Sequence, residues 1–123
     1  MRNFYRLLCC LTIGGFLLQI SWASPTDFLL AKDGFGPIFM TIDINVAGDM
    51  AELQASARND SGQPIRFAKF CVAAKGRTRG CDFELWTTAV WKPGEVLKWP
   101  LLKGRTRSGL DSARVRITQL EKN

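Results

Sequence analysis

The fold of this 123-residue chain is decided by residues 38–58, which read IFMTIDINVAGDMAELQASAR. Apolar side chains recur at every second position from Ile38 to Val46, and again from Ala51 to Ala57. A period of two is typical of a β-strand with one buried face. Gly48 and Asp49, between the two runs, are turn residues. The segment therefore predicts a β-hairpin.

The second half of this segment also has the composition of a helix, because Ala, Glu, Leu and Gln all favour helices. The alternation and the short link to the first run favour a strand instead. The register that keeps both apolar faces on one side pairs Ala47 with Met50, Ile44 with Leu53 and Ile42 with Ala55.

Turn signals at Asn59–Pro64 and Lys92–Glu95 divide the rest of the chain into further short strands. The expected strands are residues 65–74, 81–90, 96–101 and 113–120. Six to seven such strands predict an all-β fold, an antiparallel immunoglobulin-like β-sandwich. An open barrel is the alternative. The expected sandwich domain is 37–123, after a lead-in segment, 24–36, in which Phe28–Ala31 is a candidate edge strand.

The N-terminus has the three parts of a cleavable signal peptide over residues 1–23. Arg2 and Arg6 precede an apolar run, Leu7–Ile20, and Ser21-Trp22-Ala23 predicts a cut after Ala23. The run is too short for a membrane anchor, which needs about 20 apolar residues. The sequence therefore predicts a secreted or periplasmic protein with no transmembrane span after cleavage. Cleavage removes two cations and no acid, so the net charge falls from +6 to +4.

Cleavage also removes Cys9 and Cys10, which leaves Cys71 and Cys81 as a predicted disulfide in an oxidising compartment. Their spacing fits no CxxC motif, and the chain has no histidine to complete a zinc site. If the two cysteines lie opposite each other, the register pairs Phe67 with Leu85, Ile65 with Thr87, Ala68 with Glu84 and Arg66 with Trp86. Lys69 then faces Phe83 on the apolar side, which is the weak point of this register.

Residues 56–101 resemble the small immunoglobulin-like sandwich domains of exported bacterial proteins, including the FxLYD-like group. The shared features are a strand that ends in Asn, a Ser-Gly turn, two β-runs and a Pro-Gly-Glu turn. The matching positions are Asn59, Ser61, Gly62, Pro93, Gly94 and Glu95. The tetrad that names the group is absent, and the cysteine pair is an addition. The resemblance implies a sandwich fold and an accessory binding or scaffolding role, and carries over no catalytic residue.

The composition argues against an enzyme, because the chain lacks histidine, the commonest general base and metal ligand. No catalytic residue, metal ligand or cofactor is expected. Asp82 and Glu84 are the one carboxylate pair considered for acid–base chemistry. Their alternate spacing predicts instead that both lie on the solvated face of a strand.

The pentapeptide KGRTR occurs twice, at residues 75–79 and 103–107. Both copies are expected in loops at the same end of the sandwich, together with the Gly48-Asp49 turn. The clustered cations would suit phosphate, sulfate, an acidic glycan or an anionic membrane face. The alternative is that they only confer solubility, and nucleic acid is not expected as a partner. The candidate anion-binding residues are Lys75, Arg77, Arg79, Lys103, Arg105 and Arg107.

Trp86 is a candidate contact for a protein or a carbohydrate, because the register above places it on the outward face beside Arg66. The alternative is a covered ring, or a cation–π stack with Arg66. Together these features predict a secreted, non-enzymatic binding or accessory module. An anion- or envelope-binding protein that uses the KGRTR loops comes second, and a small hydrolase third. The expected partner is an unknown protein or an anionic component of the envelope.

Overall fold

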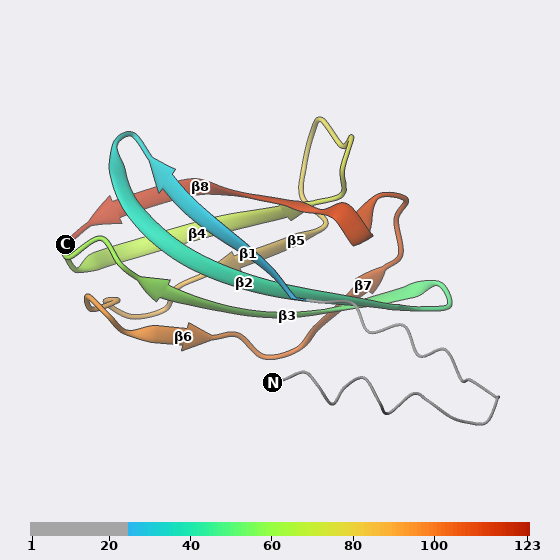
Figure 1. The fold of residues 1–123 in the computed structure, drawn as a ribbon, viewed down its shortest axis with the longest axis horizontal. Coiled ribbons are helices and arrows are strands. Elements are labelled where there is room, and N and C mark those ends of the chain that lie inside the picture. Colours follow the sequence, from blue (N-terminus) through green and yellow to red (C-terminus); the bar gives the residue numbers. More distant parts are fainter. Residues whose placement is uncertain (1–24) are drawn as a thin grey trace, which may run out of the picture.

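The computed structural model describes residues 25–123, which form two antiparallel sheets packed face to face (Figure 1). The larger sheet contains β1 (Thr26–Lys32), β2 (Phe35–Ala47), β3 (Met50–Asn59), β6 (Val96–Lys98) and β7 (Leu102–Arg105). The smaller sheet has the order β5-β4-β8, from Phe83–Trp86, Ile65–Ala73 and Arg114–Lys122. A short 3₁₀ helix, η2 (Leu110–Ser112), precedes β8. The predicted all-β sandwich is confirmed, whereas the predicted signal peptide lies outside the described residues.

The central hairpin, β2–β3, has the predicted register. Ala47 pairs with Met50, Ile44 with Leu53 and Ile42 with Ala55. The helix-favouring composition of β3 is overridden because the alternate residues Ala51, Leu53, Ala55 and Ala57 are all buried against the other sheet.

The sandwich begins before residue 37, where the sequence placed its start. β1 is an edge strand of seven residues that pairs with β2 over most of its length, and so extends beyond the expected Phe28–Ala31. At the other side of the sheet, the expected strand at 96–101 is interrupted at Trp99–Leu101. β6 and β7 are two separate strands that both pair with β3. Pro100 lacks the N–H that a continuous ladder would need at this position.

The predicted register of β4 and β5 is wrong by three residues. Phe70, rather than Phe67, lies opposite Leu85, and Val72 lies opposite Phe83. An odd shift exchanges the two faces of a strand, and here it buries Phe70 and Val72 in the core. It also removes the conflict at Lys69, which lies opposite Trp86 instead of Phe83, with its Nζ 3.8 Å from the Glu84 carboxylate.

The disulfide between Cys71 and Cys81 is confirmed, but the cysteines are not partners in the strand ladder. Cys71 lies opposite Glu84, and Cys81 belongs to the loop before β5. The bridge therefore ties the β4–β5 loop back onto β4.

The core is centred on Phe70, whose ring lies edge-on to Trp91 and Trp99, with centroids 6.2 and 6.0 Å away. Trp91 is fully buried, and its Nε1 donates to the Glu95 carbonyl at 2.9 Å. Each buried aromatic ring removes a large apolar area from water and contributes a few kcal/mol. These three rings join the two sheets.

One end of the sandwich is closed by Asn59, a fully buried polar side chain. Its Nδ2 donates to the carbonyls of Gln63 and Trp91, and its Oδ1 accepts from the N–H and hydroxyl of Ser61. Its backbone bonds to Gly94 and Glu95. The two turns that carry the family resemblance are thus in contact through one residue, because every polar atom of a buried Asn needs a partner.

Candidate functional site

The two KGRTR copies adopt different structures. The first lies wholly in the β4–β5 loop, as predicted. In the second, Lys103, Gly104 and Arg105 are part of β7, so the prediction that both copies are loops is wrong here. The glycine that both copies share is closely packed only in the second copy, because a Cβ at Gly104 would lie 3.2 Å from the Phe83 ring, whereas a Cβ at Gly76 would meet nothing within 4 Å. The missing side chain lets β7 lie close to the core, and only Thr106 and Arg107 continue into the loop.

The two copies nevertheless meet at the same end of the sandwich, as predicted. The Lys75 N–H donates to the Gly109 carbonyl at 3.0 Å. The Thr106 N–H donates to the Asp49 carbonyl at 3.0 Å, which adds the Gly48-Asp49 turn. We call this part of the molecule the basic end: the 48–49 turn, the β4–β5 loop (74–82), Arg105 at the end of β7 and the segment that links β7 to β8 (106–113).

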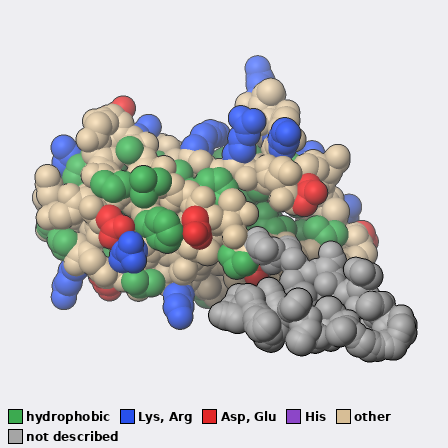
Figure 2. Space-filling model, viewed as in Figure 1, with side chains coloured by type: hydrophobic (Ala, Val, Ile, Leu, Met, Phe, Trp, Pro, Cys, Tyr) green, Lys and Arg blue, Asp and Glu red, His purple; other side chains and the backbone are tan. Residues whose placement is uncertain are grey.

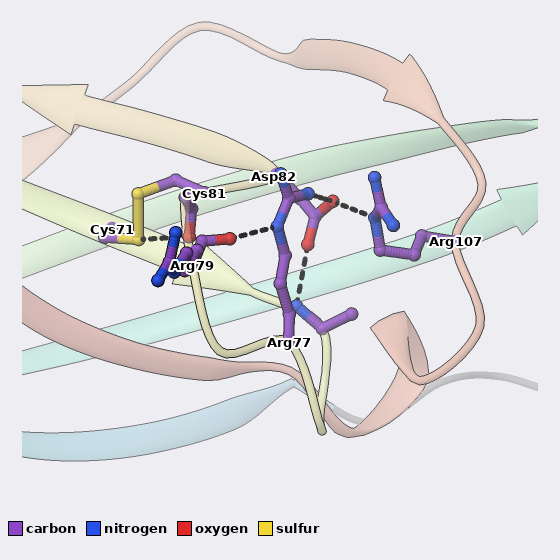
Figure 3. Close-up of polar contacts among 8 residues, drawn as sticks. Cys71, Arg77, Arg79, Cys81, Asp82 and Arg107 are labelled. Atoms are coloured by element: carbon purple, nitrogen blue, oxygen red, sulfur yellow. Dashed lines mark hydrogen bonds and ion pairs between the residues drawn. A yellow bond between two sulfur atoms is a disulfide. The ribbon is translucent and has the colours of Figure 1, made fainter.

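Asp82 joins the two copies directly (Figure 3). Its Oδ1 accepts from Arg77 Nη1 at 2.6 Å and from Arg107 Nε at 2.7 Å, and its Oδ2 accepts from the Ala74 N–H at 2.7 Å. We call these four residues the Asp82 cluster. The side chain of Asp82 is only 7% exposed, so the prediction that it lies with Glu84 on a solvated face is wrong. Asp82 precedes β5, and its side chain is oriented by the loop.

Burial by itself raises the pKa of Asp82. The hydrogen bond from the Ala74 N–H, the bond from Arg107 and the positive charges of Arg77 and Arg107 outweigh that effect, and the pKa lies below its ordinary value. Asp82 is therefore ionised near neutral pH and holds both arginines. Arg77 is fixed further by a 2.7 Å bond from its Nε to the Arg79 carbonyl.

The six predicted anion-binding residues thus fall into two groups. Arg77 and Arg107 are bound to Asp82, and Lys103 Nζ lies 3.9 Å from a Glu52 carboxylate oxygen. Within residues 25–123, Lys75, Arg79 and Arg105 form no ion pair. In Figure 2, Lys and Arg side chains gather on and beside the loop that projects between β4 and β5. The basic end has more cations than carboxylates to neutralise them.

A cavity of about 400 Å³ opens between this loop and the start of β8. Arg77, Arg114 and Arg116 contribute the charged part of its lining, and the lining contains no carboxylate. Cys71, Ala73, Ala74 and Val115 contribute an apolar part. Arg114 and Arg116 were not among the predicted site residues. Their alternation with Ala113, Val115 and Ile117 was a signal that both arginines point outward from β8.

Trp86 and Arg66 are not neighbours, so the predicted pairing of these two residues is wrong. Trp86 lies opposite Lys69, whereas Arg66 forms an ion pair with Glu121 at 2.6 Å. The indole of Trp86 is outward-facing and 49% exposed. The corrected register therefore leaves Trp86 accessible, without the guanidinium expected to cover it.

Two further properties concern the described part of the chain alone. Residues 25–123 include no helix long and apolar enough to cross a membrane. Over the same range, no group of three or more His, Cys, Asp or Glu side chains is placed to hold a metal ion.

The chain matches no protein-family model, no curated protein and no solved structure at a significant level of similarity. Its function is therefore inferred from the geometry of the sandwich.

Proposed function

We propose that the chain is an exported, non-enzymatic binding module that recognises an anionic partner in the cell envelope through its basic end. The observation that carries this proposal is the Asp82 cluster. One buried carboxylate holds two loops together while neighbouring cations, Lys75, Arg79 and Arg105, remain exposed without a carboxylate partner in residues 25–123. An ordered surface with excess positive charge attracts and orients anions, and its arginines can bind oxyanions in a bidentate way.

The resemblance to exported sandwich domains and the signal-peptide pattern support the proposed compartment. The absence of histidine from the sequence supports a role in binding rather than catalysis. An accessory module of this kind needs a fixed surface, and the disulfide and the Asp82 cluster together fix the loop that carries most of the free cations.

Retention of the purified full-length chain on immobilised heparin, a sulfated polymer, tests this proposal. The variant Lys75→Gln, Arg79→Gln, Arg105→Gln removes three cations from the basic end and leaves the Asp82 cluster intact. The matched control, Lys32→Gln, Lys92→Gln, Lys122→Gln, removes three cations near the Asn59 end. We expect the first variant to elute at clearly lower salt than the control. Equal elution would mean that only net charge matters, and would refute a localised site.

A second surface is favoured by the exposure of Trp86. Half-exposed indole rings are common anchors in protein interfaces, and Val90, which is 43% exposed, follows on the same segment. If a partner docks here, its capture from an envelope extract resists high salt and is lost in Trp86→Ala.

A further inference from the structure

The cavity beside the β4–β5 loop forms where long side chains on β8 lie next to short side chains on the paired strand β4. Arg114 and Arg116 on β8 lie opposite Ala73 and Cys71 on β4. Alternate residues of a strand point to the same face, so two long cationic side chains border a shallow apolar floor made by an alanine and the disulfide. The loop forms the remaining wall.

Of the three arginines that line this cavity, Arg77 is paired with Asp82, but Arg114 and Arg116 are not neutralised from within residues 25–123. Arg114 and Arg116 are exposed and form no ion pair there. Along the ladder from Arg116, Glu84 lies beyond Cys71 on the next strand and interacts with Lys69. Two guanidinium groups on one face thus lack the oxyanion partner that their fork of N–H donors fits.

The loop wall is ordered before any ligand arrives. Cys71–Cys81 ties its end to β4, and the Asp82 cluster and the Arg79 carbonyl fix Arg77. Gly80 permits this packing, because its φ is +74° and a Cβ there would lie 2.9 Å from Arg77 Nη2. A cavity that is already formed avoids the entropy cost of ordering a loop on binding.

Building on the proposed function, we infer that this cavity binds a phosphate monoester. The guanidinium groups of Arg114 and Arg116 bind the phosphate oxygens, and the organic part of the ester rests on Ala73 and the Cys71–Cys81 disulfide, which lie on the same face. A doubly charged oxyanion suits two arginines better than a single carboxylate does, and the apolar floor adds contact that inorganic phosphate cannot use. The volume of about 400 Å³ is within the range of small-molecule sites.

The test is isothermal titration of the purified full-length chain with phenyl phosphate and with inorganic phosphate. We expect saturable binding, tighter for phenyl phosphate. The variant Arg114→Gln, Arg116→Gln should weaken phenyl phosphate binding by at least about tenfold, since each lost charged contact is worth close to that factor. The matched control, Lys92→Gln, Lys122→Gln, removes the same charge from the Asn59 end, outside the cavity, and should stay within about twofold.

A second variant removes no charge. Ala73→Leu fills the floor of the cavity from a surface position and should weaken phenyl phosphate while leaving thermal unfolding close to that of the wild type. Absence of saturable binding to the wild type would overturn the inference. It would also be overturned if the Lys92→Gln, Lys122→Gln control lost as much affinity as the β8 variant, or if Ala73→Leu bound phenyl phosphate as well as the wild type.

Vesicles of phosphatidylcholine with phosphatidic acid distinguish a lipid headgroup from a soluble ester. Co-sedimentation that Arg114→Gln, Arg116→Gln abolishes and phenyl phosphate competes away supports the site with a lipid source. Phenyl phosphate binding that can be titrated, without co-sedimentation, supports the site with a soluble ester as its ligand.

If heparin retention depends on Lys75, Arg79 and Arg105 but phenyl phosphate does not bind, this inference fails and the proposed function stands. If phenyl phosphate binds but the two heparin variants elute alike, the proposed function fails instead.

Discussion

Replacing Asp82 by asparagine tests the contact on which the basic end depends. Asparagine has nearly the same shape and keeps an oxygen that can accept from the Ala74 N–H, so the change removes mainly the negative charge. What is lost is the attraction to Arg77 and Arg107, at 2.6 and 2.7 Å. We expect the variant to fold with a less stable basic end.

The magnitude follows from the burial of the three side chains. Asp82 is 7% exposed and Arg77 is 27% exposed, so we assign their bond about 1.5 kcal/mol, the lower end for a charged hydrogen bond. Arg107 is 52% exposed, and a pair with so much water around one partner contributes roughly 0.5 kcal/mol. The total is about 2 kcal/mol, which for a domain of this size lowers the melting temperature by roughly 10 °C.

Urea unfolding of wild type and Asp82→Asn over a range of pH measures this difference. Because the folded pKa of Asp82 lies below its ordinary value of 3.8, its stabilisation is complete above that value. It is lost as the pH falls through the folded pKa. The difference between the two proteins should therefore be largest near neutrality and shrink in acid. Asp111→Asn, an exposed aspartate after the second KGRTR copy, is the matched control and should change little. A neutral-pH difference below about 0.5 kcal/mol, or one unchanged in acid, would refute the reasoning.

Three further predictions concern the same fold. Gly109→Ala should destabilise the protein by about 2 kcal/mol more than Gly76→Ala. Both glycines have φ of +89°, but only at Gly109 would a Cβ lie 2.7 Å from a carbonyl oxygen, that of Lys75. Equal decreases in melting temperature for the two variants would contradict this. Replacing Cys71 and Cys81 together by alanine should cost about 3 kcal/mol in urea unfolding, through the freed loop and lost packing; a loss below about 1 kcal/mol would argue against the loop's role. Trp86→Phe should reduce the fraction of tryptophan emission that acrylamide quenches, because the ring is 49% exposed; an unchanged fraction would mean a covered ring.

The hairpin of residues 38–58 was predictable because its alternation, its turn and its burial all agree. The β4–β5 register was not, since it was anchored on the cysteines. A disulfide constrains two residues to be near each other, but it does not require them to be ladder partners. Phe70 and Val72 decide the register by their burial, and an apolar run such as 65–74 has no strict alternation to reveal which residues point inward.

For the candidate site, sequence and topology predicted that the KGRTR copies would meet, but not how. Asp82 was predicted to lie with Glu84 on a solvated face, and its contact with Arg107, 25 residues away, depends on the path of the loop. Arg114 and Arg116 were missed because charged residues at alternate positions of a strand usually face only solvent. Their significance depends on the short side chains of Cys71 and Ala73 across the ladder.

The two ends of the sandwich are stabilised by different kinds of interaction. The Asn59 end is tied by hydrogen bonds of a buried neutral amide, whereas the basic end is tied by charge on Asp82. Acid therefore weakens the basic end more than the Asn59 end, where the Arg58–Asp60 ion pair is exposed and contributes little. The two ends should therefore open in a fixed order: as the pH falls, amide hydrogen exchange should rise first around residues 74–82 and 106–113, while the turns at 59–64 and 92–95 stay protected for longer.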